Sequence, residues 1–162
     1  MKDKFFREHI TKILQGGVVY APFDEIVADF PGKEINTIFP KGTYSAWDLL
    51  EHIRRTQIDI LEFMRNPKYV EPEWPKDYWP DVKKKATIKD WQNTITNYKK
   101  ELQDLISLLN DPKIDLSAKV PNGSSQTYLR EFLLVADHTS YHLGEFSIMR
   151  QTMNTWGKKS KK

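Results

Sequence analysis

The feature that most constrains the fold is a long apolar stripe with helical spacing in the last third of the chain. Its members are Tyr128, Phe132, Val135, Thr139, His142, Phe146, Met149 and Met153, at alternating steps of four and three residues. Residues with this spacing share one face of an α-helix and form the buried seam of a helical bundle. The pattern predicts a helix from about Ser125 to Asn154.

Three earlier stretches have the same period. The first runs from about Asp3 to Gln15, with an apolar face at Phe6, Ile10, Ile13 and Leu14, and Gly16-Gly17 stops it. A short helical segment is expected at 23–30. The second long helix starts at Ser45, which is a good N-cap, and ends at Asn66-Pro67. The third starts at Thr87, and Asn110-Asp111-Pro112 ends it. Asp48 lies three residues after Ser45, and Asp90 lies three residues after Thr87. Both pairs are similar in pattern to a capping box.

The segment between the second and third long helices, residues 67–86, is called the strap below. It has 20 residues, with four prolines and the aromatic residues Tyr69, Trp74, Tyr78 and Trp79. This composition predicts an ordered segment that lies on the surface of the domain. A helix of about 22 residues is ~33 Å long, and an extended chain covers ~3.3 Å per residue. The strap can therefore run the length of a bundle and join two parallel helices.

These elements predict an all-α protein, a four-helix bundle with a long crossover between helices two and three, in the order up-down-down-up. One domain is expected over residues 1–157, since 162 residues fit a single domain. The composition, 39% hydrophobic and 29% charged, is that of an ordinary globular protein. No apolar run reaches the ~20 residues of a membrane span, and the first residues do not resemble a secretory signal. We therefore expect a cytoplasmic protein with no membrane partner.

Charge and cysteine content exclude further classes. The chain has no cysteine, so disulfides, thiolate nucleophiles and cysteine-based zinc sites are excluded. The net charge of +3 comes largely from residues 158–162, which we expect to form a disordered basic tail. Such a tail can also contact nucleic acid or an anionic membrane. Because the rest of the chain is close to neutral, no nucleic-acid partner is expected.

Histidines are the candidate metal ligands. The chain has four, and His138 and His142 lie four residues apart on the last helix, so their side chains share a face. A pair at this spacing is half of a typical zinc or nickel site. His52 borders the apolar face of the second long helix and is the third candidate, whereas His9 is expected at the surface. From the residues alone, a metal site and hydrogen-bonded core histidines remain open alternatives.

Two segments resemble a known family. SAWDLLEHIRRTQIDILEF at 45–63 and LREFLLVADHTSYHLGEFSIMRQTMNTW at 129–156 are similar to the second and last helices of the DinB-like superfamily. The intervening EPEWPKDYWP at 71–80 and SSQTYLREFLLVADH at 124–138 also fit that pattern, so the resemblance extends to about residue 157. It implies a four-helix bundle with a parallel middle pair and a divalent metal, zinc or nickel, held by His52, His138 and His142. None of these three positions departs from the family pattern.

The resemblance also implies an activity. Family members of known activity transfer a low-molecular-weight thiol to an electrophile or isomerise a substrate with the help of a thiol, and others are assigned as hydrolases. We therefore expect a small-molecule substrate, a thiol cofactor in the first case, and a homodimer. The alternative is a non-catalytic, metal-stabilised helical bundle that binds a small molecule or a protein partner.

Five further residues are candidates for roles around the metal. Asp59 and Glu145 are expected either to orient the imidazoles or to act as a general base, and the alternative is that both are solvated surface acids. Trp47, Trp79 and Tyr141 are candidates for lining a substrate pocket at the end of the bundle, and plain packing is the alternative for each.

Overall fold

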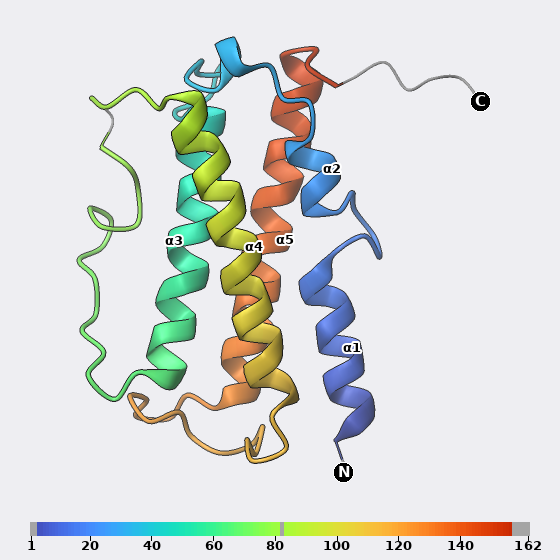
Figure 1. The fold of residues 1–162 in the computed structure, drawn as a ribbon, viewed down its shortest axis with the longest axis vertical. Coiled ribbons are helices and arrows are strands. Elements are labelled where there is room, and N and C mark those ends of the chain that lie inside the picture. Colours follow the sequence, from blue (N-terminus) through green and yellow to red (C-terminus); the bar gives the residue numbers. More distant parts are fainter. Residues whose placement is uncertain (1–2, 82, 157–162) are drawn as a thin grey trace.

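The computed structural model describes residues 3–81 and 83–156. Within them are five α-helices, one 3-10 helix and no strand (Figure 1). The elements are α1 (Lys4–Gln15), α2 (Phe23–Val27), η1 (Gly32–Glu34), α3 (Ala46–Arg65), α4 (Ile88–Asn110) and α5 (Tyr128–Thr152). The predicted all-helical class is confirmed. The basic tail expected at 158–162 lies outside the described residues, and among those described no helix is long and apolar enough to cross a membrane.

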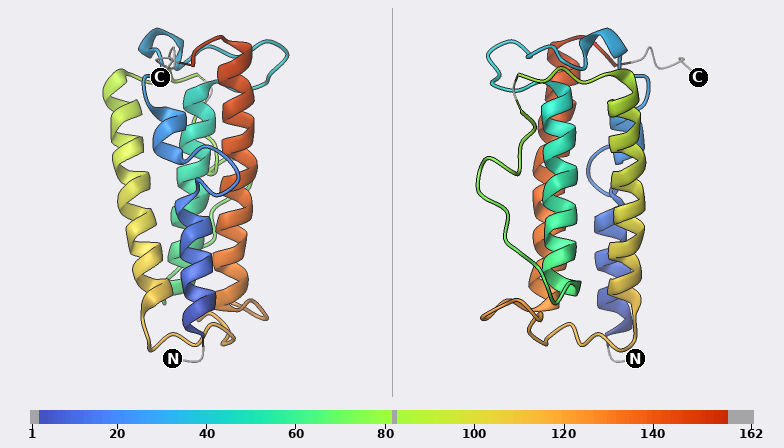
Figure 2. Two further views of the ribbon diagram at one scale, coloured as in Figure 1. Left: turned by 90° about the vertical axis from the view of Figure 1, so that its right-hand side faces the viewer. Right: turned by 60° about the vertical axis from the view of Figure 1, so that its left-hand side comes forward.

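The four helices of more than ten residues lie side by side (Figures 1 and 2). α3 packs against both α4 and α5, and α1 also packs against α4 and α5. In Figure 1, α3 and α4 run downward, whereas α1 and α5 run upward. The packed pair of α3 and α5 brings together the two helices that carry the candidate metal ligands.

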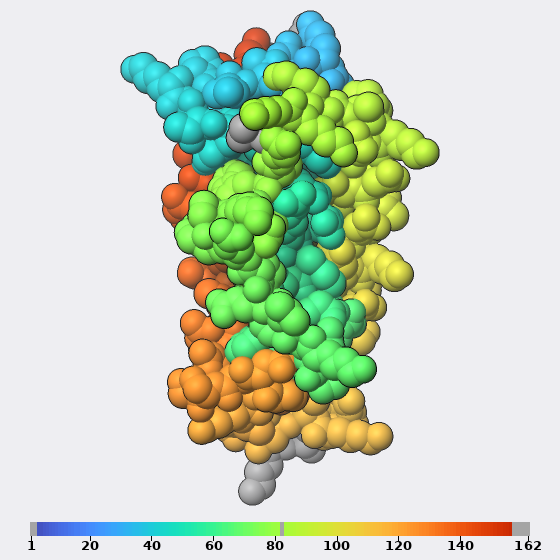
Figure 3. Space-filling model, turned by 90° about the vertical axis from the view of Figure 1, so that its left-hand side faces the viewer, coloured from blue at the N-terminus to red at the C-terminus, as the bar shows by residue number. Residues whose placement is uncertain are grey.

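The strap lies along α3 and returns the chain to the end from which α4 starts (Figure 3, green). Tyr69 packs edge-on against Phe63, and Pro80 is buried. The hydroxyl groups of Tyr69 and Tyr78 each donate a 2.7 Å hydrogen bond to the Asp59 carboxylate on α3. The aromatic residues of the strap therefore fix it on the bundle.

Two helices begin where the sequence predicts, because their start signals are local. The Ser45 hydroxyl accepts a hydrogen bond from the Asp48 backbone N–H, and the Asp48 carboxylate accepts one from the Ser45 N–H. Thr87 and Asp90 form the same reciprocal pair at the start of α4. Each capping box satisfies two backbone donors that the helix leaves unpaired.

The predicted start of α5, near Ser125, is wrong by three residues. The helix begins at Tyr128, after an N-cap at Thr127. The backbone before it is extended, because the Val120 N–H bonds to the Gln126 carbonyl and the Tyr128 N–H to the Ala118 carbonyl. These pairings on both sides of Thr127 hold its backbone in an extended conformation, so the helix starts only at Tyr128. The short helix expected at 23–30 is likewise only Phe23–Val27.

The predicted apolar face of α1 is wrong in part. Ile10 and Leu14 are buried, but Phe6 is 65% exposed and Ile13 is 42% exposed. Arg7, only 3% exposed, occupies the buried face instead. Its guanidinium donates to the backbone carbonyl of Leu109 in the last turn of α4 and to that of Ile114 in the segment that follows. A cation is stable there because these carbonyls and the Asp3 carboxylate, 2.6 Å from the guanidinium, replace its water.

A second buried arginine holds the opposite end of the molecule. Arg150 on α5 is 1% exposed and donates to the carbonyls of Ile26 and Ala28 at 2.6 and 2.7 Å. It also donates to the Thr155 carbonyl at 2.6 Å and lies over the Trp156 ring. One side chain thus connects the end of α2, α5 and the chain that follows it.

We expect Arg150→Met to lower the free energy of unfolding by about 3 kcal/mol, because several buried carbonyls lose a charged donor. Urea unfolding followed by circular dichroism measures the change. The control is Arg65→Met on α3, which removes an exposed ion pair with Glu62 and should cost less than about 1 kcal/mol. Equal losses in the two variants would contradict the role assigned to Arg150.

Candidate metal centre

Three histidines converge between α3 and α5. His52 lies in the second turn of α3, and His138 and His142 lie one turn apart near the middle of α5. One ring nitrogen from each comes within 4.8 Å of the others. His52 and His142 are buried, and His138 is half-buried. The structure thus brings together the three residues that the sequence singles out.

The ring of His52 is held by the strap. Its Nδ1 lies 3.0 Å from the Tyr78 carbonyl oxygen, which can only accept a hydrogen bond. Nδ1 therefore carries the proton, and Nε2 of the neutral ring keeps its lone pair. The indole ring of Trp79 stacks on the imidazole at 3.9 Å between centroids, with 4° between the planes.

The ring of His142 is held by Glu145, one turn further along α5. Nδ1 lies 2.6 Å from the Glu145 carboxylate. A carboxylate acceptor places the proton on Nδ1, which leaves the Nε2 lone pair of His142 for the cluster. The Glu145 carboxylate also accepts hydrogen bonds from the hydroxyls of Tyr44 and Tyr141. Burial, and after it the hydrogen bond to Glu145, raises the pKa of Tyr44. The hydrogen bond to Glu145 is the main cause that raises the pKa of Tyr141.

His138 completes the cluster. Its Nε2 lies 3.2 Å from Nε2 of His52. Burial, followed by the neighbouring imidazoles of His142 and His52, lowers the pKa of His138 to about 3. Burial is also the main cause that lowers the pKa of His52. Neutral imidazoles are the form in which histidine binds metals.

The donor set fits a divalent metal. His52 and His142 each direct a lone pair into the cluster, and neutral His138 can supply a proton to only one of them. Two nitrogens bound to one zinc ion at 2.0–2.1 Å in a tetrahedral arrangement lie about 3.4 Å apart, close to the 3.2 Å between His52 and His138. The three-histidine group can therefore bind a divalent metal ion, and imidazole suits zinc and nickel alike.

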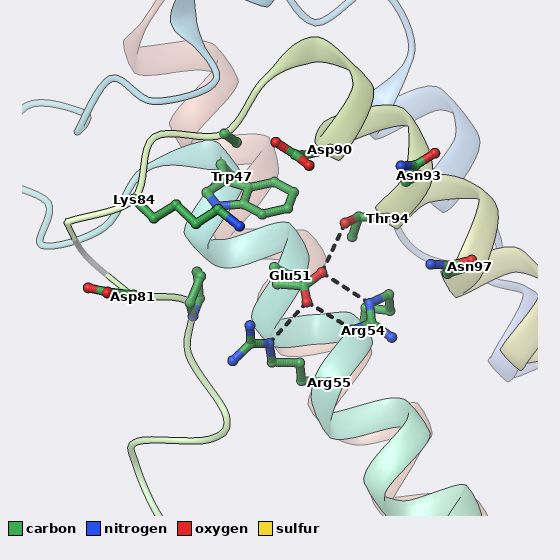
Figure 4. A pocket seen from close by; sticks show the side chains of 12 residues that line it. Trp47, Glu51, Arg54, Arg55, Asp81, Lys84, Asp90, Asn93, Thr94 and Asn97 are labelled. Carbon is green, nitrogen blue, oxygen red and sulfur yellow. Dashed lines mark hydrogen bonds and ion pairs between the residues drawn. The ribbon is translucent and has the colours of Figure 1, made fainter.

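The other predicted site residues lie in different places. Trp79 is at the cluster, and Tyr141, 63% exposed, contacts the His142 ring edge-on at 4.9 Å. Trp47 lines a cavity of about 320 Å³ on α3 and α4, together with Glu51 and Thr94 (Figure 4). The carboxylate of Asp59 bonds to Tyr69 and Tyr78 instead of a histidine.

Two side chains near the cluster, Tyr44 and Arg55, and the carbonyl of Tyr78 were not predicted from the sequence. Tyr44 bonds to Glu145, and Arg55 donates to strap carbonyls. The strap composition indicates order, but no local pattern specifies which strap residue faces His52. Exposed His9 on α1 is not in the three-histidine group.

The fold and the cluster define an all-helical protein with a three-imidazole site between two packed helices. The chain belongs to the DinB superfamily, since the model of that family matches residues 18–146. No curated protein and no solved structure matches the chain significantly. The matched residues include all three histidines, the strap and Glu145.

We expect Glu145→Gln to weaken the binding of a divalent metal by about 10–100-fold, because the His142 ring loses the carboxylate that fixes its tautomer. Competition with a chromophoric chelator measures the affinity. The matched control is Asp137→Asn, which changes an exposed carboxylate beside His138 and should leave the affinity unchanged. Equal affinities of Glu145→Gln and the parent would show that the carboxylate does not orient His142.

Proposed function

We propose that the protein is a metal-dependent enzyme that acts on a small molecule through the site formed by His52, His138 and His142. The main observation in support is that His52 and His142 each direct an Nε2 lone pair into the cluster, because Tyr78 and Glu145 accept from their Nδ1 atoms. Three protein ligands leave a further position for a water molecule or a substrate, as catalytic zinc sites do. We also propose that the helices form a four-helix bundle in the order up-down-down-up, with the strap as its crossover.

The reaction type that we propose is thiol transfer or hydrolysis. A zinc or nickel ion in such a site lowers the pKa of a ligated thiol or water and supplies a nucleophile at neutral pH. Because the chain has no cysteine, a thiol would come from a low-molecular-weight cofactor. Membership of the DinB superfamily supports both the metal and this reaction class.

The protein's own residues would then orient the ligands and shape the approach. Tyr78 and Glu145 fix the rings of His52 and His142. Trp79 covers one face of His52 and excludes water there, while exposed Tyr141 stands beside His142 on the side open to solvent. Since Glu145 already accepts from His142, we assign it to orientation and not to proton abstraction.

We expect about one equivalent of zinc or nickel in the purified parent protein and a loss of that metal in His138→Ala and in His142→Ala. Elemental mass spectrometry measures the content, and His9→Ala is the matched control because that histidine is exposed on α1. Removing the metal with a chelator should lower the melting temperature of the parent and leave both cluster variants unchanged, since a ligand stabilises only the state that binds it.

A parent protein that holds no metal and takes none up on reconstitution would overturn the proposal. If metal binds, the enzyme predicts consumption of a thiol with an electrophilic acceptor, or cleavage of a model ester, and the loss of either in the cluster variants. Metal-dependent stability with no turnover across such a panel would favour the non-catalytic bundle.

A further inference from the structure

Three successive backbone carbonyls of the strap accept hydrogen bonds from two side chains of α3. The Arg55 guanidinium donates through Nη1 to the carbonyls of Asp77 and Trp79, at 3.0 and 2.7 Å. Between them, the Tyr78 carbonyl faces Nδ1 of His52 at 3.0 Å. His52 and Arg55 are three residues apart on α3, so their side chains lie on neighbouring parts of one face. The strap segment 77–79 is thus bound to α3 at each of its carbonyls.

Arg55 is itself held by Glu51, one turn earlier on α3. Its Nε donates to the Glu51 carboxylate at 3.0 Å (Figure 4). Glu51 is buried, and it also accepts from Arg54 at 2.8 Å and from Thr94 on α4 at 2.9 Å. The planar guanidinium has a rigid fork of donors, so a fixed Nε leaves little freedom to Nη1. The position of the strap is therefore set by a network that includes α3 and α4.

The side chains of the same strap segment make a second set of contacts with α3. The Tyr78 hydroxyl donates to Asp59 at 2.7 Å, two turns of α3 away from His52. The Trp79 ring is stacked on His52. Because the carbonyls on both sides of Tyr78 are held by one guanidinium, the Tyr78 carbonyl stays aimed at His52. Loss of Arg55 would leave that carbonyl held only by the side-chain contacts of Tyr78 and Trp79 and by backbone hydrogen bonds within the strap.

We propose that Arg55 is a positioning residue of the metal site, which acts through the strap carbonyls to fix the orientation and tautomer of His52. This inference rests on the proposed metal site and extends it to a residue that touches none of the three ligands' ring nitrogens. It assigns the strap a part in metal binding beyond that of a connection between α3 and α4.

The test compares Arg55→Met and Arg55→Lys with the control Arg65→Met in the full-length protein. Met keeps the length of the side chain but donates nothing, and Glu51 retains Arg54 and Thr94, so the variant should fold. Lys keeps the charge beside Glu51 but lacks the fork through which Arg55 bonds Glu51 by Nε and both carbonyls by Nη1. Arg65 is on the same helix, and its charged partners are Glu62 and Asp104.

Two measurements separate positioning from a general structural role. The affinity for Co²⁺ or Zn²⁺ should fall about 10-fold in Arg55→Met, less in Arg55→Lys and not in Arg65→Met, and the visible spectrum of the Co²⁺ form should change in the same order. In the metal-free protein, histidine ring ¹⁵N shifts should report a proton on Nδ1 of His52 in the parent and a mixture of tautomers in Arg55→Met.

Each outcome decides the inference. If Arg55→Met binds Co²⁺ as tightly as the parent, with an unchanged spectrum and an unchanged His52 tautomer, Arg55 does not position the site even if the variant is less stable to urea. If the parent binds no metal, the proposed function fails, and the tautomer of His52 alone decides whether Arg55 acts on it.

Discussion

A neutral imidazole that is buried between two helices has two ring nitrogens, and each needs a partner to replace the water it loses. For His52 and His142 the partner of Nδ1 is an acceptor that cannot donate, the Tyr78 carbonyl in one case and Glu145 in the other. Both rings are therefore forced to present an Nε2 lone pair to the same small volume, where His138 also points. A divalent cation satisfies all three nitrogens at once, which hydrogen bonds among the rings cannot do.

The direction of the helices and the chemistry of the site are linked through the strap. α3 and α4 run the same way in Figure 1, so the chain must travel back along the bundle between them. A tight turn would join antiparallel helices and would leave Nδ1 of His52 without the carbonyl that sets its tautomer. The long return path instead carries Tyr78 and Trp79 over α3, at the turn where His52 lies. The connection thus supplies part of the site that the two helices alone would lack.

The sequence predicts those features that depend on neighbouring residues. The capping boxes at Ser45 and Thr87 and the pairing of His138 with His142 need only contacts within one turn of helix. Residues whose environment is set by distant chain segments were predicted less well. The loop that pairs with 126–128 delays the start of α5, and buried Arg7 displaces Phe6 from the core face of α1. Arg55 was missed for the same reason, since its carbonyl partners are 22 and 24 residues away along the chain.

If the three-histidine group binds a metal as proposed, the contacts between the strap and α3 would link that binding to the position of the strap. A docked strap holds His52 in the tautomer that binds, so a metal ion would prefer the docked state. By reciprocity the ion would stabilise docking by the same free energy. Two α3 side chains that oppose undocking bond to none of the three histidines: Arg55, held by Glu51, and Asp59, which accepts from the hydroxyls of Tyr69 and Tyr78. Changes at these two residues would therefore alter the proposed affinity for metal without removing a ligand. A substrate that displaced the strap would weaken the hold on His52, whereas one that packed against Trp79 and Tyr141 would leave it intact.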